Sequence, residues 1–131
     1  MDDCPFCLRI ANGEVAWSVE NAVAFADGYP LNPGHTLVVP RSHCGDLFAL
    51  PADVRRRLWD LVEVVIEELR EQHSPDGFNV GVNIGAAGGQ TIDHAHIHVI
   101  PRFDGDVDDP RGGVRWVVPG RAAYWQGSGP E

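Results

Sequence analysis

The sequence predicts an α+β domain, and three features of its pattern lead to that fold class. One long segment has the helical repeat of apolar residues, and segments rich in β-branched residues lie on both sides of it. Glycine and proline, 15 and 10 of the 131 residues, interrupt the chain at short intervals, and no internal repeat is present. With 44% apolar and 22% charged residues, we expect one domain over residues 1–131.

The N-terminal part of the chain predicts a β-hairpin followed by a third strand. Residues 15–20 (VAWSVE) and 22–27 (AVAFAD) are separated only by Asn21, as in a hairpin. Residues 29–34 (YPLNPG) have turn composition, and residues 35–40 (HTLVVP) form a β-branched run that Pro40 should end.

Residues 51–73 predict one long amphipathic helix, because apolar residues recur there at intervals of three and four. Pro51 suits the first helical position, and the sequence HSPDG at 73–77 should end the helix. The apolar positions are Val54, Leu58, Leu61, Val62, Val65, Ile66 and Leu69.

The second half of the chain predicts an antiparallel pair of strands joined by a glycine-rich loop. The strands are residues 78–84 (FNVGVNI) and 94–100 (HAHIHVI), and the loop is 85–89 (GAAGG). An acidic loop at 103–113 and a short apolar piece at 114–119 follow, before a tail that contains Tyr124 and Trp125.

The charge of the chain excludes several classes of function. A net charge of −9 argues against nucleic-acid and membrane partners, so a bound polyanion needs a local donor-rich site. All ten basic residues are arginine, which excludes catalysis by lysine. Because the N-terminus is acidic and no apolar run approaches about eighteen residues, we expect a cytoplasmic protein without a signal peptide.

Three histidines alternate with apolar residues at His94, His96 and His98. On a strand they would share one face, with Ala95, Ile97 and Val99 on the other. Such a face could be merely solvated, could ligate a metal, or could supply an imidazole nucleophile that forms a phosphohistidine. The glycine-rich stretch NIGAAGGQT (83–91) just upstream favours the last possibility, because its backbone N–H groups can surround a phosphate.

Cys4 and Cys7 form a C-x-x-C pair, which supplies two of the four ligands of a tetrahedral zinc site. An odd number of cysteines, three, does not suggest a disulfide framework. The residues alone leave the other two ligands open among His43, Cys44, His35, His73 and one histidine of the alternating set.

The motifs together resemble the histidine triad (HIT) superfamily, in the same order and with similar spacing over most of residues 4–102. GGQTIDHAHIHVIPR (88–102) looks like its signature, and AFADGYPLNPGHTLVVPRSH (24–43) is similar to its nucleotide-binding segment. CPFCLRIANGE (4–14) resembles the N-terminal element of bacterial members. The resemblance implies a five-stranded antiparallel sheet with one helix packed on it, a homodimer, and a domain core at 4–102 with a C-terminal extension at 103–131.

The resemblance also implies catalytic roles. His96 would attack the α-phosphorus of a nucleotide, and His98 would bind the phosphate and assist the leaving group. His35 would help to orient the catalytic histidine, and Gln90 would lie near the bridging oxygen. The implied nucleotide-binding residues are Asp27, which would hold the ribose hydroxyls, Asn83, Gly89, Gln90, Thr91, His96 and His98, with Phe6, Ile10, Phe25 and Leu37 as candidates for either base contact or core.

Bacterial members that this chain resembles imply a structural zinc ion held by Cys4, Cys7, His43 and His94. The implied activity is a nucleotidyl hydrolase that releases a nucleoside monophosphate from a dinucleoside polyphosphate or a nucleoside phosphoramidate, with a purine nucleotide as the expected ligand. The alternatives are a phosphorylase or transferase, and a nucleotide-binding regulatory module with little turnover. Arg102, Arg111 and Arg115 could meet distal phosphates, or Arg111 and Arg115 could pair with the aspartates of the acidic loop.

Overall fold

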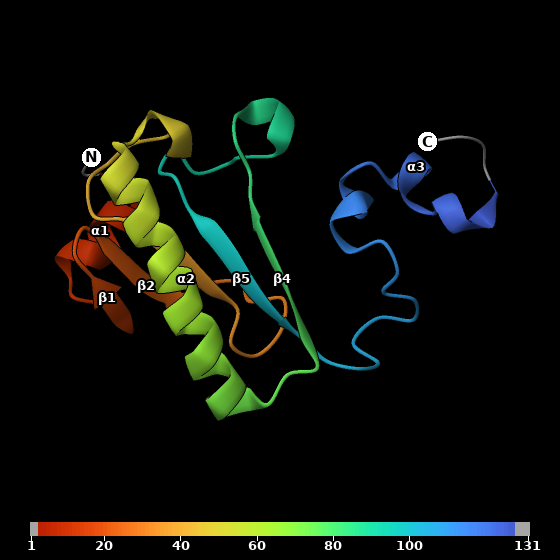
Figure 1. The fold of residues 1–131 in the computed structure, drawn as a ribbon. Coiled ribbons are helices and arrows are strands. Elements are labelled where there is room, and N and C mark those ends of the chain that lie inside the picture. Colours follow the sequence, from red (N-terminus) through yellow and green to blue (C-terminus); the bar gives the residue numbers. More distant parts are fainter. Residues whose placement is uncertain (1–2, 128–131) are drawn as a thin grey trace.

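The computed structural model describes residues 3–127, which form a five-stranded antiparallel sheet in the order β1-β2-β3-β5-β4 (Figure 1). The end of the predicted C-terminal extension, 128–131, lies outside the described residues. The expected α+β class and the antiparallel sheet are confirmed. The strands are β1 (Trp17–Val19), β2 (Ala22–Ala26), β3 (Thr36–Pro40), β4 (Gly77–Val82) and β5 (Ile97–Arg102).

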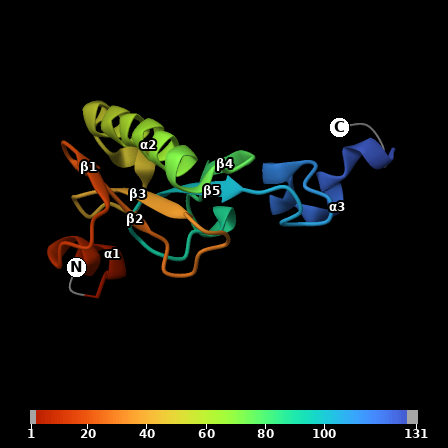
Figure 2. The same cartoon turned by 90° about the horizontal axis from the view of Figure 1, so that it is seen from below.

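The long helix α2 (Ala52–His73) covers one face of the sheet, as Figure 2 shows. Its apolar stripe is buried against Ala24, Val38 and Ile97 of the three central strands. Pro51 lies at the N-cap, so the helix begins at Ala52, one residue after its predicted start. It ends at His73, followed by Ser74 as a left-handed C-cap (φ 48°) whose N–H donates to the carbonyl of Arg70.

The short helix α1 (Pro5–Ala11) packs on the opposite face of the sheet, so the central strands are buried on both sides (Figure 2). Successive residues of a strand point to opposite faces, and Val23 and Phe25 therefore join Phe6 of α1 while Ala22 and Ala24 join α2. This two-sided burial holds α1, which contains Cys7 and has Cys4 as its N-cap, so that Cys7 lies close to His43 just after β3.

The predicted hairpin is confirmed, with Trp17 opposite Ala24, but the strand predicted at 94–100 is wrong at its start. β5 begins at Ile97, because local bonds replace the sheet ladder upstream of it. The side chain of His94 donates a hydrogen bond to the carbonyl of Pro40, and the N–H of Ala95 donates to the carbonyl of Cys44. The predicted division of faces persists, since Ala95 and Val99 still pack in the α2 core.

The C-terminal extension runs past the edge strand β4 instead of joining the sheet (Figure 1). The predicted apolar piece at 114–119 falls on a 3-10 helix, Gly113–Val117, followed by the single turn α3 (Pro119–Ala122). Among residues 3–127, no helix is long and apolar enough to cross a membrane. The homodimer stays a prediction.

Candidate functional site

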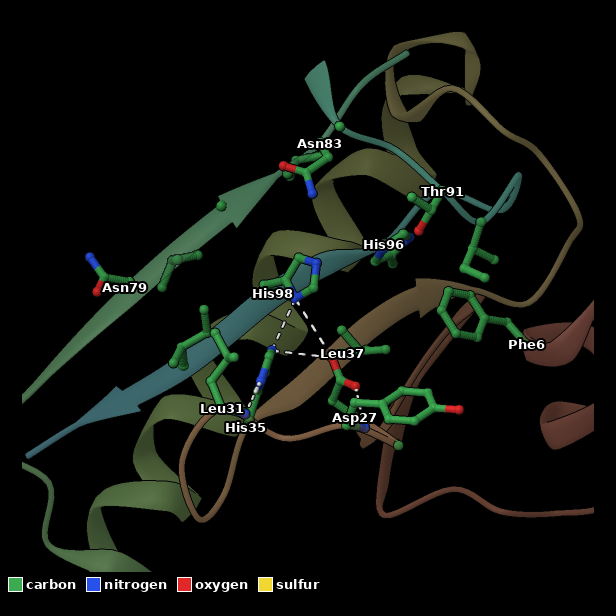
Figure 3. Close-up of a pocket in the computed structure, with 18 of the residues that line it drawn as sticks. Phe6, Asp27, Leu31, His35, Leu37, Asn79, Asn83, Thr91, His96 and His98 are labelled. Atoms are coloured by element: carbon green, nitrogen blue, oxygen red, sulfur yellow. Dashed lines mark hydrogen bonds and ion pairs between the residues drawn. The ribbon is translucent and has the colours of Figure 1, made fainter. Parts of the chain in front are cut away.

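A cavity of about 1050 Å³ lies along the exposed side of β4 and β5, on the α1 side of the sheet. Residues distant in the sequence meet there, from α1, the loop between β2 and β3, the glycine-rich loop and the C-terminal extension. The predicted site residues that line it are Asp27, His35, Asn83, Gly89, Thr91, His96 and His98, together with Phe6 and Leu37 (Figure 3).

His96 is buried beside the ring of Phe6 and has one nitrogen occupied by the backbone. Its Nδ1 lies 2.8 Å from the carbonyl oxygen of His94, a bond that requires the proton on Nδ1. In the neutral ring the Nε2 lone pair is then free, which is the state that a nucleophilic or basic imidazole needs. The edge contact with Phe6, 5.0 Å between ring centroids, helps to hold the ring in this orientation.

His98 has the opposite proton arrangement, set by a chain of three groups. The N–H of Leu31 donates to Nδ1 of His35, so a neutral His35 carries its proton on Nε2. That Nε2 lies 3.0 Å from Nδ1 of His98 and donates to it (Figure 3). The Nε2 of His98 therefore bears a proton and is a hydrogen-bond donor.

The carboxylate of Asp27 lies close to the imidazole rings of both His35 and His98. One of its oxygens accepts the N–H of Tyr29 at 2.8 Å, and the other lies 3.4 Å from Nε2 of His35 and 3.9 Å from Nδ1 of His98. A carboxylate of this kind retains lone pairs that can accept further hydrogen bonds from hydroxyl groups.

Burial keeps the imidazoles of His35 and His98 neutral. Desolvation lowers the pKa of His98 to about 4, with His96 and His35 adding to the effect and Asp27 opposing it. Desolvation also lowers the pKa of His35 from its ordinary value, again against the attraction of Asp27. At neutral pH the proton positions described above are therefore those of uncharged rings.

This lowered pKa predicts a pH-dependent stability. Between about pH 6.5, where a histidine of the unfolded chain titrates, and about pH 4, the unfolded state binds more protons at His98, so stability falls as the pH falls. His98→Asn should remove up to about 1.4 kcal/mol of slope per pH unit in that window. Urea unfolding of both proteins at pH 7 and pH 5 measures the difference, and parallel losses would contradict the assignment.

The glycine-rich loop is braced from within by Gln90. The Oε1 of Gln90 accepts the N–H of Gly85, and its Nε2 donates to the carbonyls of Gly45 and Ile92, at 2.8 and 3.0 Å. Gly85 and Gly89 have φ values of 75° and 91°, which favour glycine. The structure thus places Gln90 in the loop scaffold and not among the residues that line the cavity, and its contact with a bridging oxygen stays a prediction.

Four donor atoms converge next to the cavity, at Cys4, Cys7, His43 and His94. The Nδ1 of His94 lies 3.5 Å from both thiol sulfurs, and the Nδ1 of His43 lies 3.3 Å from that of Cys7. All four atoms are within 4.8 Å of one another. These are the separations expected around one tetrahedral ion.

The chemistry of the four donors also fits zinc. The Nε2 of His94 donates to the carbonyl of Pro40 at 2.8 Å, which leaves Nδ1 as a lone pair aimed at the thiols. Desolvation lowers the pKa of His94 and raises the pKa of the Cys7 thiol. Without a cation, burial therefore favours the neutral imidazole of His94 and the neutral thiol of Cys7. Two thiolates and two neutral imidazoles are the ligands of a closed structural zinc site.

Other candidate residues lie elsewhere. Cys44 donates to the carbonyl of Asp46, apart from the four-donor cluster, and Phe25 and Ile10 pack in the core beneath α1. Arg102 is bound by both oxygens of Asp106 at 2.8 Å and by Asn79. Arg111 pairs with Asp109 at 2.9 Å, as one of the two predicted alternatives has it.

Sequence reasoning missed two sets of cavity residues. Leu31 orients His35 through its N–H, and the Asn-Pro-Gly turn at 32–34, which folds Leu31 back toward His35, was a usable signal. Val114 and Val117 line the cavity from the C-terminal extension, and no local pattern points to that contact.

The comparisons with known proteins agree with this geometry. The HIT domain family matches residues 11–105, and the chain belongs to that family. An uncharacterized HIT-like protein of Methanocaldococcus jannaschii is 39% identical over 79% of this chain and 81% of its own length. A zinc-bound histidine triad family protein of Mycobacterium smegmatis has a TM-score of 0.70 and 34% identity, covering 80% of this chain and 78% of its own.

Some of the relatives carry the names of enzymes. The AP-4-A phosphorylase of Mycobacterium tuberculosis is 36% identical over 77% of this chain. The match covers 49% of that protein, so this chain spans about half the length of the named enzyme. The likeness concerns the domain that carries the alternating histidines.

Proposed function

We propose that this protein is a hydrolase that acts at the α-phosphate of a nucleotide through a phosphohistidine intermediate. The observation that carries the proposal is the state of His96, whose Nδ1–H is bound to the carbonyl of His94 and whose Nε2 is left as a lone pair in the cavity. Family membership and the name of the phosphorylase relative support nucleotide chemistry at this site.

In the first step, the lone pair of His96 Nε2 forms a bond to the α-phosphorus. The bond from phosphorus to the leaving oxygen or nitrogen breaks, its electron pair stays with the leaving group, and solvent supplies the proton that completes it. The imidazole is left as an N-phosphorylated cation, which the carbonyl of His94 stabilises by accepting the Nδ1–H.

His98 assists as a hydrogen-bond donor. Its Nε2–H is available to a phosphoryl oxygen because the chain from Leu31 through His35 fixes the proton there. With a pKa of about 4 it is uncharged, so it stabilises the oxygen charge without transferring a proton. One such preorganised donor typically lowers a barrier by about 3–4 kcal/mol.

In the second step, water attacks the phosphorus and loses a proton to solvent. The phosphorus–nitrogen bond breaks, and its electron pair returns to Nε2 of His96. The products are a nucleoside monophosphate and the free enzyme, with no net change in the side chains.

Other residues of the cavity position the nucleotide. Asp27 accepts hydrogen bonds from the ribose hydroxyls, and Phe6 and Leu37 pack against the base, since all three line the cavity that contains His96 and His98 (Figure 3). Asn83, Gly89 and Thr91 surround the phosphate from the glycine-rich loop. A zinc ion would be held by Cys4, Cys7, His43 and His94. It would cross-link α1 to the segment that carries His94 and His96, and it would take no part in the steps above.

A product analysis tests hydrolysis against the alternatives. With adenosine 5′-phosphoramidate or diadenosine tetraphosphate as substrate, we expect adenosine monophosphate as the product, and one oxygen from labelled water in it. Added inorganic phosphate should leave the product unchanged. Adenosine diphosphate formed only with phosphate present would identify a phosphorylase instead, and binding of nucleotide without turnover of either substrate would identify a regulatory module.

A further inference from the structure

We propose that Asp106 is a positioning residue, which holds the turn at 29–34 and through that turn fixes the proton that His98 offers to the substrate. Asp106 lies in the acidic loop after β5 and is not among the residues that line the cavity, so it acts only through other groups. The inference rests on the proposed function for its effect on turnover, whereas the placement of the turn is measured without substrate.

The carboxylate of Asp106 is tied to the sheet through Arg102, the last residue of β5. Both oxygens of Asp106 accept hydrogen bonds from the guanidinium of Arg102 at 2.8 Å, and one of them also accepts the N–H of Phe103 at 3.0 Å. The hydrogen bonds from Arg102 hold the pKa of this carboxyl well below its ordinary value, so Asp106 is charged at neutral pH. Arg102 also donates to the side chain of Asn79 in β4 at 2.6 Å, which fixes the pair on the sheet.

From this position Asp106 binds the turn that precedes β3. The Nδ2 of Asn32 donates to Oδ2 of Asp106 at 2.8 Å and to the carbonyl of Pro101 at 3.0 Å. Both acceptors are oxygens, so the two N–H groups of the Asn32 amide face them, one for each acceptor. A charged acceptor makes a stronger hydrogen bond than a neutral one, so the bond to Asp106 is the stronger of the two.

The turn has little apolar anchoring of its own. The side chains of Tyr29 and Leu31 are 91% and 71% exposed, and they join neither of the two buried clusters among the described residues. Gly34 fixes the end of the turn next to β3, since a Cβ atom there would lie 3.2 Å from the ring of Pro101. The middle of the turn is therefore held chiefly by the side chain of Asn32.

The middle of the turn carries the groups that orient the histidines. Leu31 donates its N–H to Nδ1 of His35 at 3.1 Å, and the carbonyl of Asn32 accepts the N–H of His35 at 3.1 Å. His35 in turn donates its Nε2–H to His98 at 3.0 Å (Figure 3). A shift of Asn32 therefore displaces two contacts of His35, and a misplacement of about 1 Å in an active site can lower the rate about 100-fold.

Replacing Asp106 with alanine tests the inference by amide hydrogen exchange and by kinetics. We expect the Leu31 amide to exchange at least about 10-fold faster, because its hydrogen bond to His35 opens more often, while the amides of β3 keep their rates. With adenosine 5′-phosphoramidate, kcat should fall about 10- to 100-fold. KM should change less than about 3-fold, since His98 acts on the charge of the transition state.

Two further variants separate the turn from general effects of the acidic loop. Asp109→Ala is the matched control, because it removes an aspartate–arginine pair of the same loop, the one with Arg111 at 2.9 Å, and it should keep the wild-type exchange rates and kcat. Asn32→Ala should reproduce both effects of Asp106→Ala. The double variant should lose no more than about 2-fold further in kcat, because the two side chains act through one hydrogen bond.

The outcomes separate this inference from the proposed function. If Asp106→Ala keeps the wild-type exchange rate at Leu31, or if that rate rises without a fall in kcat, Asp106 is no positioning residue while the hydrolase remains. An equal rise in exchange across β3, or the same losses in Asp109→Ala, would also overturn the inference, because the effect would then be general. If the wild type turns over no nucleotide substrate, the proposed hydrolase is overturned, and the exchange of the Leu31 amide alone decides whether Asp106 holds the turn.

Discussion

Replacing His96 with asparagine should lower kcat for nucleoside phosphoramidates by at least about 10⁴-fold, because the variant has no lone pair with which to form the covalent intermediate. Asparagine retains an amide N–H that can still reach the carbonyl of His94, so the surrounding chain should fold as before. Single-turnover kinetics with a radiolabelled phosphoramidate measures the loss and any covalently labelled protein.

The control for this loss is nucleotide binding. His96→Asn should bind adenosine monophosphate with an affinity within a few-fold of the wild type, since Asp27 and the glycine-rich loop are intact. We expect acid-labile phosphate on the wild-type protein and none on the variant. Turnover by His96→Asn within about 10-fold of wild type would show that the nucleophile is another group.

Replacing Cys4 with serine should remove zinc and destabilise the fold. Zinc bound at about 1,000 times its dissociation constant contributes about 4 kcal/mol to the free energy of unfolding, so a loss of that order is expected. Cys4 is also the N-cap of α1, where its sulfur accepts the N–H of Cys7 at 3.4 Å, and serine can keep that bond. Metal content by mass spectrometry, together with thermal unfolding, measures both effects.

Cys44→Ser is the matched control, because Cys44 is half-buried on the neighbouring loop but lies outside the four-donor cluster. It should keep about one zinc per chain and the wild-type melting temperature. Zinc near zero in the wild type and in Cys4→Ser alike would contradict a zinc site. Zinc lost from Cys44→Ser instead would show that Cys44 is the ligand.

The sequence predicts the elements well wherever a periodic pattern is backed by burial. The helix predicted at 51–73 is α2, since its apolar stripe packs on the sheet, and the hairpin across Asn21 is present. The strand predicted from residue 94 begins at Ile97. Upstream of Ile97, hydrogen bonds of the His94 side chain and of the loop residue Cys44 replace those of the sheet. The periodicity of apolar residues does not show which donor a backbone carbonyl will accept a hydrogen bond from.

The site divides in the same way. Motif spacing brings the four predicted metal ligands together and places His96 and His98 in one cavity. The motif predicts Gln90 near a bridging oxygen, but it does not predict the hydrogen bonds of the Gln90 amide to three backbone groups, which only the folded loop determines. Val114 and Val117 reach the cavity through a tertiary contact with β4, for which the sequence carries no local signal.

The histidines of the site share one property that follows from the backbone bonds described above. His94 and His96 each donate one N–H to a carbonyl, and His35 accepts the N–H of Leu31. The arrangement of protons in the site is thus determined by backbone hydrogen bonds that form when the chain folds. A substrate that enters meets dipoles already aligned, so little reorganisation is left for the chemical step, and the enthalpy of aligning them is part of the folding reaction.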